Sequence, residues 1–266
     1  MKGTRRLCIV RRGHMGDVVL TEPIASALRP HYASVALCTE YVEAGRLLEI
    51  YDDVLPYSRR LERDLDDFQE TIELIYEIFP GCNHLDGYAR FAGVEPRHRL
   101  PRVRRGAKRL IAGPYGLVAP DTSSFVQRMR QWPRERFLEL REELQDALGM
   151  PFVLLEPHHS FSEMVALCEH SSCFVGNDSG PAILSQCFGR PTFVIFGATS
   201  PGLVLLDPGA VPIVSDVGCN GCKHFARHTD IECNTPLCLE SLTVEMARNS
   251  IVVAGRDLAS RLRESI

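Results

Sequence analysis

Residues 173–201 constrain the fold of this chain more than any other segment. Their sequence, CFVGNDSGPAILSQCFGRPTFVIFGATSP, gives an apolar run of strand length, a polar turn, a helical pattern and a second apolar run. Two buried strands joined by a helix are typical of a parallel sheet, in which ligands bind at the carboxyl ends of the strands. Ser179 is a natural N-cap and proline is tolerated in a first turn, so a helix is predicted to begin near Pro181. Its unpaired N–H groups suit a phosphate or diphosphate, whereas the plainer interpretation is an ordinary capped turn.

The same alternation of strand and helix runs along the rest of the chain. Strands are predicted at residues 7–10, 35–38, 53–56, 72–79, 110–120, 151–155, 173–176, 192–196 and 210–214. Helices are predicted at 18–28, 41–50, 84–93, 132–148, 162–170, 181–188 and 243–266. Residues 94–109 interrupt the pattern with two prolines and seven Arg or Lys, so they are interpreted as an interdomain connection. We therefore predict an α/β protein with two Rossmann-like domains, residues 1–100 and 101–266, whose parallel sheets face each other across a cleft.

Bulk properties exclude several classes of function. A net charge of −4 gives no reason to expect a nucleic-acid-binding protein. No apolar stretch reaches the 18 residues that a membrane span requires. The apolar run before Arg11 has only four residues, which is too short for the core of a signal peptide, so a cytoplasmic location is expected.

Three segments resemble glycosyltransferase family 9, the ADP-heptose:lipopolysaccharide heptosyltransferases and their relatives. They are RRGHMGDVVLTEPIASALRP near the N-terminus, APDTSSFVQRMRQWPRERFLEL in the middle and GNDSGPAILSQCFGRPTFVIFGATSP after it. The resemblance implies a GT-B fold and an inverting transfer of a heptose-like sugar. The donor would be ADP-heptose or a related nucleotide-diphosphate sugar. The acceptor would be a glycan, a lipid-linked saccharide of the lipopolysaccharide type, or a protein.

The resemblance also assigns roles to individual residues. Asp17 would be the general base, although an aspartate after a glycine turn is also a common helix cap. Arg130 would stabilise the departing diphosphate, with Arg128 as a competitor and a solvated surface arginine as the alternative. The implied donor-binding residues are Gly16, Asn177, Asp178, Ser179, Gly180, Pro181, Thr199 and Ser200. No metal would be required for catalysis, because the helix terminus and Arg130 carry the positive charge.

Two departures from the family open a second hypothesis. Ile183 stands where the family usually has a histidine, and only residues 156–161 separate a strand from the next helix, where the family has a further helix and strand. Glu156 is the nearest substitute for the acidic residues that bind the ribose in the family. His158 and His159 are interpreted as loop residues. These changes favour a degenerate relative that binds a nucleotide or a partner without catalysis.

Four of the ten cysteines cluster between residues 219 and 238. They are Cys219, Cys222, Cys233 and Cys238, and His224 and His228 lie between them. The spacing suits a structural zinc or iron ion bound by four thiolates, and some relatives bind iron through a similar segment. Free thiols and disulfides are the alternatives, the latter disfavoured in a reducing compartment. Such a segment could also pin an oligomer contact.

Overall fold

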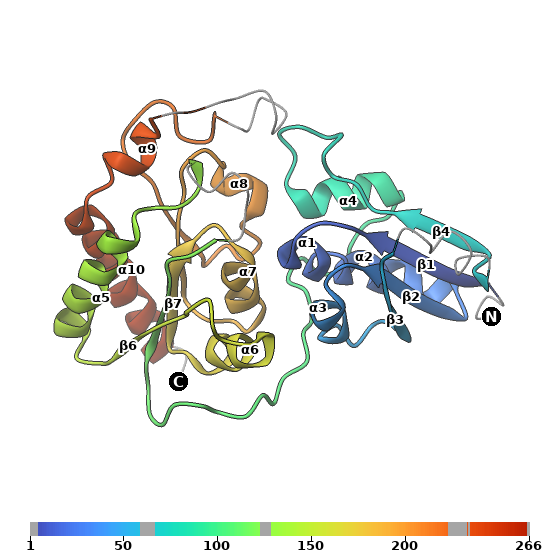
Figure 1. Cartoon of the computed structure of the whole chain (residues 1–266), viewed down its shortest axis with the longest axis horizontal. Coiled ribbons are helices and arrows are strands. Elements are labelled where there is room, and N and C mark those ends of the chain that lie inside the picture. The colour runs from blue at the N-terminus through green and yellow to red at the C-terminus, as the bar shows by residue number, and fades with distance from the viewer. Residues whose placement is uncertain (1–4, 59–66, 123–128, 223–232, 234, 265–266) are drawn as a thin grey trace. The chain divides into compact units, whose positions relative to one another are not determined.

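The computed structural model describes residues 5–58, 67–122, 129–222, 233 and 235–264. The chain divides into two compact units, Met1–Gly106 and Ala107–Ile266, and each contains a parallel sheet with its own helices (Figure 1). Among the described residues, none of the helices combines the length and the hydrophobicity that a bilayer span requires. The predicted α/β class with two parallel sheets is confirmed.

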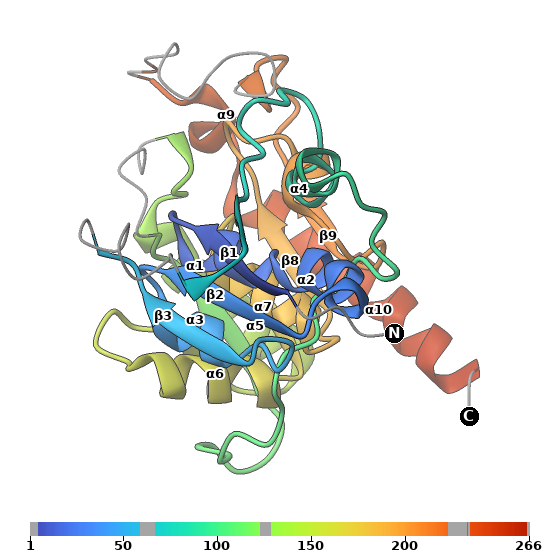
Figure 2. The same ribbon diagram turned by 90° about the vertical axis from the view of Figure 1, so that its right-hand side faces the viewer.

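The first unit is built on a four-stranded sheet with the order β3-β2-β1-β4. Its strands are β1 (Arg6–Arg11), β2 (Ser34–Thr39), β3 (Asp53–Pro56) and β4 (Glu70–Glu73). All three pairings are parallel, and Figure 2 shows β3, β2 and β1 side by side. Strands β1 and β2 are almost entirely buried, because alternate residues of each face opposite layers of apolar side chains.

The helices of the first unit are short. They are α1 (Met15–Val19), α2 (Glu22–Leu28), the 3-10 helix η1 (Arg29–His31), α3 (Val42–Arg46) and α4 (His84–Ala92). The single helix predicted for 18–28 is divided into α1, which ends at Val19, and α2, which begins at Glu22. Pro23 lies in the first turn of α2, where proline is tolerated. Strand β4 lies earlier than predicted, so residues 74–79 form the loop that leaves the sheet.

The second unit contains a five-stranded parallel sheet with the order β6-β5-β7-β8-β9. The strands are β5 (Gly116–Ala119), β6 (Phe152–Leu154), β7 (Cys173–Asn177), β8 (Thr192–Ile195) and β9 (Val211–Ile213). As predicted, Pro212 lies in an edge strand, where its missing N–H costs no ladder bond. Strands β5 and β6 approach closely because Gly116 has no side chain: a Cβ atom there would lie 2.2 Å from the ring of Phe152.

Helices cover both faces of this sheet. They are α5 (Arg134–Leu148), α6 (Phe161–His170), α7 (Gly180–Cys187), α8 (Pro201–Val204), α9 (Leu237–Glu240) and α10 (Val244–Glu264). On one face, Phe137 and Leu144 of α5 and Ile251 of α10 pack with Val175 and Phe193 of the strands. Helices α6 and α7 lie on the other face (Figure 1). The sheet therefore has two layers of helix, as the near-continuous apolar runs of its strands require.

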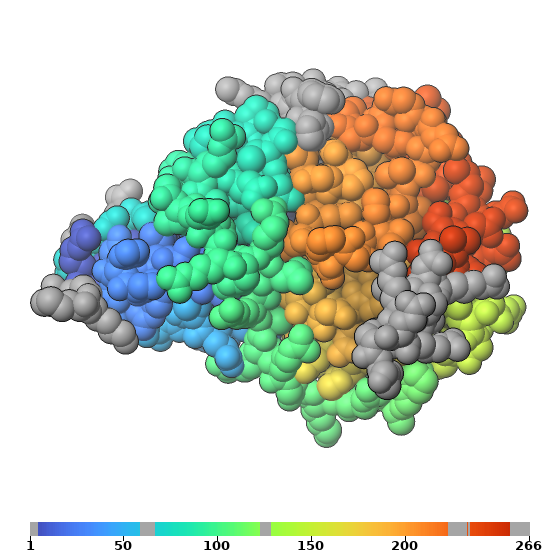
Figure 3. Space-filling model, turned by 180° about the vertical axis from the view of Figure 1, so that it is seen from behind, coloured from blue at the N-terminus to red at the C-terminus, as the bar shows by residue number. Residues whose placement is uncertain are grey.

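Residues 94–110 form neither helix nor strand, and this segment lies on the surface (green in Figure 3). It is nevertheless anchored within each unit. In the first unit, buried Glu22 accepts hydrogen bonds from the backbone N–H of Arg102 at 3.0 Å and pairs with Nε2 of His98 at 2.8 Å. In the second unit, Glu169 of α6 accepts the backbone N–H of Ala107 at 2.9 Å. Buried side chains thus hold a segment that has no apolar periodicity of its own.

Candidate active site

Each sheet has a point where the strand order reverses. In the first unit the chain proceeds outward from β1 to β2 and β3 and then returns to place β4 on the other side of β1. In open parallel sheets, ligands bind in the crevice beyond the carboxyl ends of the strands at such a point. Arg11 is the last residue of β1, Asp17 follows in α1, and Glu77 follows β4. Three charged side chains thus lie where a ligand is expected.

Asp17 is held firmly at the start of α1. Its side chain is 12% exposed, and its Oδ2 accepts the backbone N–H of His14 at 2.9 Å. The preceding turn requires a glycine, because Gly13 has a φ of +123° and a Cβ there would lie 2.9 Å from Oδ2 of Asp17. Asp17 therefore caps the helix, and the capping and catalytic interpretations are compatible.

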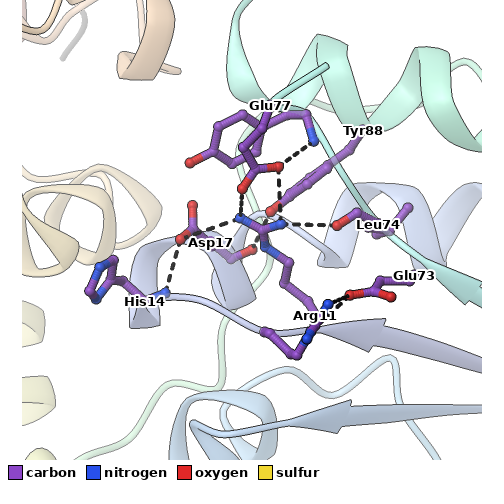
Figure 4. A network of polar contacts seen from close by, with 9 residues as sticks. Arg11, His14, Asp17, Glu73, Leu74, Glu77 and Tyr88 are labelled. Carbon is purple, nitrogen blue, oxygen red and sulfur yellow. Dashed lines mark hydrogen bonds and ion pairs between the residues drawn. The ribbon is translucent and has the colours of Figure 1, made fainter. Parts of the chain in front are cut away.

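Arg11 lies between Asp17 and Glu77 (Figure 4). Its Nη2 is 2.7 Å from Oε1 of Glu77 and 3.6 Å from Oδ2 of Asp17, while its Nη1 donates to the carbonyl of Leu74 at 3.0 Å. Burial opposes the positive charge, but neighbouring Tyr88 and the two carboxylates outweigh it and raise the pKa of Arg11. In turn, Arg11 lowers the pKa of Glu77 against the effect of burial. The buried cation is thus fully compensated.

Two tyrosines enclose this network. The rings of Tyr76 and Tyr88 lie 4.9 Å and 5.2 Å from the guanidinium carbon of Arg11, which is cation–π range. Burial and the carboxylate of Asp17 raise the pKa of both phenols well above 10. Both tyrosines therefore stay neutral beside Asp17. Arg11, Tyr76, Glu77 and Tyr88 were not predicted from the sequence as site residues; the signal available was a charged residue, Arg11, at the end of the apolar run of β1.

The second unit reverses its strand order between β5 and β7. Asn177, the last residue of β7, is fully buried and joins the two loops that leave this point. Its Oδ1 accepts the backbone N–H of Trp132 at 2.9 Å, and its Nδ2 donates to the carbonyl of Pro120 at 2.6 Å. Asn177 thus fixes the loops that carry other residues of the candidate site.

Arg130 and Asp178 form an ion pair beside it. Nη2 of Arg130 donates to Oδ2 of Asp178 at 2.6 Å and to the backbone carbonyl of Asp178 at 2.8 Å. Arg130 is therefore not the solvated surface arginine that the sequence left open, while Arg128 lies outside the described residues. Within the part of the chain that the structure describes, Nε of Arg130 is buried and has no hydrogen-bond partner.

Ser179 is the N-cap residue of α7, which begins at Gly180 with Pro181 in its first turn. The predicted position is confirmed, but the predicted cap is not: the Ser179 side chain makes no capping hydrogen bond. Its Oγ is buried and has no partner among the described residues. A hydroxyl group and a guanidinium N–H without partners, beside the first backbone N–H groups of an eight-residue helix, are the groups that bind a phosphate.

The comparisons with known proteins agree with this geometry. Residues 138–230 match the model of glycosyltransferase family 9 (heptosyltransferase). This match lies within the second unit and covers about a third of the chain. No curated protein matches the sequence significantly.

Solved structures of several glycosyltransferases share the fold. TibC, an iron-containing dodecameric heptosyltransferase from enterotoxigenic E. coli H10407 that was also solved with ADP-D-β-D-heptose, is 18% identical. It gives a TM-score of 0.76 over 97% of this chain and 78% of TibC. The E. coli ADP-heptose LPS heptosyltransferase II is 14% identical, with a TM-score of 0.70 over 96% of this chain and 98% of that enzyme. The family 9 glycosyltransferase of Veillonella parvula DSM 2008 is 13% identical, with a TM-score of 0.64 over 95% and 97% of the two chains.

The remaining residues predicted to bind the donor differ in their surroundings. Gly16 is buried in α1 and Thr199 is buried after β8. Ser200 is the N-cap of α8 and makes no side-chain capping bond. A Cβ on Gly221 would lie 3.1 Å from Cβ of Ser200, so the turn between Cys219 and Cys222 packs against this loop.

The residues at the two departures from the family pattern are buried or paired in the structure. Ile183 is buried in α7 and contributes to the core. Glu156 pairs with Arg134 at 2.7 Å, and Arg134 also pairs with Asp121 beyond β5. His159 accepts the backbone N–H of Glu156 at 2.9 Å through its Nδ1. Arg134 was not identified from the sequence, although its position directly after Trp-Pro placed it at a predicted helix start.

The four clustered cysteines form no disulfide with one another. Burial and the nearby thiols of Cys219, Cys222 and Cys233 raise the pKa of Cys238 to about 11. Within the described ranges, no three Cys, His, Asp or Glu side chains form a group that could hold a metal ion. His224 and His228 lie outside the described residues. The thiols thus lie near one another, but the described residues do not form the predicted metal site.

The cysteine segment is joined to the donor-side loops. The backbone N–H of Gly221 donates to the carbonyl of Gly197 at 3.0 Å, and the N–H of Ala198 donates to the carbonyl of Met129 at 3.0 Å. Met129 directly precedes Arg130. Gly197 and Ala198, which follow β8, therefore hold both the turn between Cys219 and Cys222 and the loop that carries Arg130.

Proposed function

We propose that this chain is a family 9 glycosyltransferase, which transfers a heptose-like sugar with inversion from a nucleotide-diphosphate donor. The observation that carries the proposal is the pair of buried Ser179 Oγ and Arg130 Nε, without partners among the described residues, beside the N-terminus of α7. These groups lie beyond β7, next to the strand reversal where α/β folds bind nucleotides. Asp17 occupies the equivalent edge of the other sheet.

In this proposal the acceptor hydroxyl attacks the anomeric carbon of the donor sugar. Asp17 accepts the proton of that hydroxyl, and the bond between the anomeric carbon and the diphosphate oxygen breaks. The nucleoside diphosphate leaves with the bonding electrons. The backbone N–H groups of α7, the Ser179 hydroxyl and Arg130 stabilise the negative charge that develops on its oxygens. Asp178 holds the guanidinium of Arg130 through Nη2, which leaves Nε for a phosphate oxygen.

ADP-heptose is the first donor to test, because TibC was solved with ADP-D-β-D-heptose. The acceptor is proposed to be a glycan, a lipid-linked saccharide or a protein. A cytoplasmic location and an oligomeric assembly remain predictions from the sequence.

A structural iron or zinc ion at Cys219, Cys222, Cys233 and Cys238 is a further part of the proposal. TibC is described as iron-containing, and Cys238 here lies near Cys219, Cys222 and Cys233 without a disulfide among them. A bound metal ion would stabilise the thiolate forms and join the two ends of the cysteine segment. No catalytic step depends on it.

The test of the transferase is release of ADP from ADP-heptose by the purified chain. We expect Asp17→Asn to reduce ADP release at least about a hundredfold, because removal of a general base costs factors of that order. Asp86→Asn is the matched control: Asp86 also lies in the first turn of a helix and pairs with an arginine, Arg99, but it does not belong to the network of Asp17. Equal loss in both variants would contradict the role of Asp17.

The same assay tests the second hypothesis, that the chain is a non-catalytic relative. That hypothesis is favoured by Ile183, which is buried and stands where the family has a polar contact to the donor. Tight ADP binding without turnover by the wild-type chain would support that hypothesis instead.

A further inference from the structure

Glu77 binds Arg11 more closely than Asp17 does. Both oxygens of Glu77 contact the guanidinium, at 2.7 Å from Nη2 and 3.3 Å from Nη1, whereas the nearest oxygen of Asp17 is 3.6 Å from Nη2. Figure 4 shows the three side chains in this arrangement. The Glu77 carboxylate is also bonded by the backbone N–H of Tyr76 at 2.9 Å, which fixes its direction.

The net charge of the groups around Asp17 determines how readily it accepts a proton. With Arg11 as its only charged neighbour, protonation of Asp17 would leave an unpaired buried cation, which is costly. With Glu77 present, protonation of Asp17 leaves a neutral pair of Arg11 and Glu77. The second carboxylate therefore removes the electrostatic obstacle that Arg11 alone would create for a general base.

We propose that Glu77 is a positioning residue that keeps Asp17 basic by neutralising Arg11 while Arg11 holds Asp17 in place. This inference rests on the proposed role of Asp17 as the proton acceptor. It gives the loop after β4 a role in the reaction, although this loop lies outside the sequence motifs.

Other groups also face Asp17. They are Arg11 at the end of β1, His14 before α1, Tyr76 and Glu77 after β4, and Tyr88 on α4. His14 contacts Asp17 through its backbone N–H, and the hydroxyl of Tyr88 lies 3.4 Å from the backbone carbonyl of Asp17. Both phenols remain protonated, because burial and Asp17 raise their pKa values well above 10. Glu77 is therefore the second negative charge that compensates Arg11.

The test is a direct titration of Asp17 without substrate. The chain is labelled with ¹³C at the aspartate carboxyl carbons, and the Asp17 signal is assigned by its loss in Asp17→Asn. We expect Glu77→Gln to lower the titration midpoint of Asp17 by about one pH unit, because an adjacent opposite charge then acts uncompensated.

Glu73→Gln is the matched control. Glu73 lies four residues earlier, is 43% exposed against 41% for Glu77, and pairs with the neighbouring arginine, Arg12, at 2.5 Å. This variant removes the same charge without touching Arg11, so its Asp17 midpoint should match the wild type. An equal midpoint in both glutamine variants, or a rise in Glu77→Gln, would overturn the inference. Should Glu77→Gln fail to fold, Glu77→Asp keeps the charge at a greater distance and should give a smaller downward shift; no shift there overturns the inference too.

The result separates this inference from the proposed function. A lowered midpoint without any sugar transfer by the wild-type chain would refute the transferase and leave the electrostatic role of Glu77 intact. An unchanged midpoint in a chain whose activity depends on Asp17 would refute the role of Glu77 alone. Where transfer occurs, the acidic limb of the kcat pH profile should move with the midpoint.

Discussion

The buried amide of Asn177 offers a sharp test of how the donor-side loops are held. Replacement of Asn177 by aspartate keeps the size of the side chain and an acceptor for the backbone N–H of Trp132. It removes the N–H donor that now bonds the carbonyl of Pro120 at 2.6 Å. In its ionised form the new carboxyl group also places a charge at a fully buried position, opposite that carbonyl oxygen.

The expected cost depends on pH. A buried carbonyl without its donor costs about 1–3 kcal/mol of unfolding free energy. Burial and the facing carbonyl raise the pKa of the new carboxyl group above its unfolded value of about 3.9. The protonated carboxyl group can donate a hydrogen bond to the carbonyl of Pro120. This bond stabilises the variant fully below the pKa that the carboxyl group has in the unfolded chain, and it is lost as pH rises through the higher pKa of the folded chain. Over that interval each pH unit lowers the unfolding free energy by about 1.4 kcal/mol.

The assay is urea unfolding followed by tryptophan fluorescence at pH 5 and pH 8. Trp132 is the chain's single tryptophan and is fully buried, so its emission reports on the second unit. Relative to the wild type at the same pH, Asn177→Asp should lose markedly more stability at pH 8 than at pH 5. Asn249→Asp, at an exposed position beside Arg248 on α10, is the control and should change little at either pH. A stability difference for Asn177→Asp that is the same at both pH values would refute this reasoning.

Two further predictions concern the core and the cysteines. Gly116→Ala should lower the unfolding free energy of the second unit by about 1–3 kcal/mol in the same fluorescence assay, because its Cβ would collide with Phe152. In the control Gly202→Ala, the new Cβ meets nothing within 4 Å, so the change should be nearly neutral. Equal stability of the two variants would show that β5 and β6 can separate freely. Elemental analysis of the purified chain should find about one iron or zinc ion per chain that is lost in Cys238→Ser but kept in Cys82→Ser; no bound metal in the wild type would refute the proposed site.

The fold class was predictable from the sequence because each strand and helix of a parallel sheet has a characteristic local pattern of apolar residues. Strands buried on both faces must be continuous apolar runs, and the crossover helices between them must be amphipathic or apolar. The start of α7 at a polar turn was predictable for the same reason, since Ser, Gly and Pro have positional preferences at helix starts. Boundaries were less predictable where the local signal was weak. Residues 72–79 are an apolar run interrupted by two glutamates, yet only Glu70–Glu73 pair with β1.

The candidate site was predictable only in part. Asp17, Arg130 and the turn at Asp178 were identified because they lie in short motifs that resemble a family. Glu77 was not, because it lies sixty residues after Asp17 and comes near it only through the pairing of β4 with β1. The same holds for Arg134, whose partners Asp121 and Glu156 follow two different strands.

The sequence by itself determined which segments become strands and helices, and which charged residues end them, because those choices depend on neighbours along the chain. Only the tertiary structure decided that Arg11 stands between two carboxylates, that Arg130 is bound by Asp178 and that Ser179 leaves its helix uncapped. Contacts of this kind depend on the order and register of strands that are distant in sequence, and burial then fixes which charges must compensate one another.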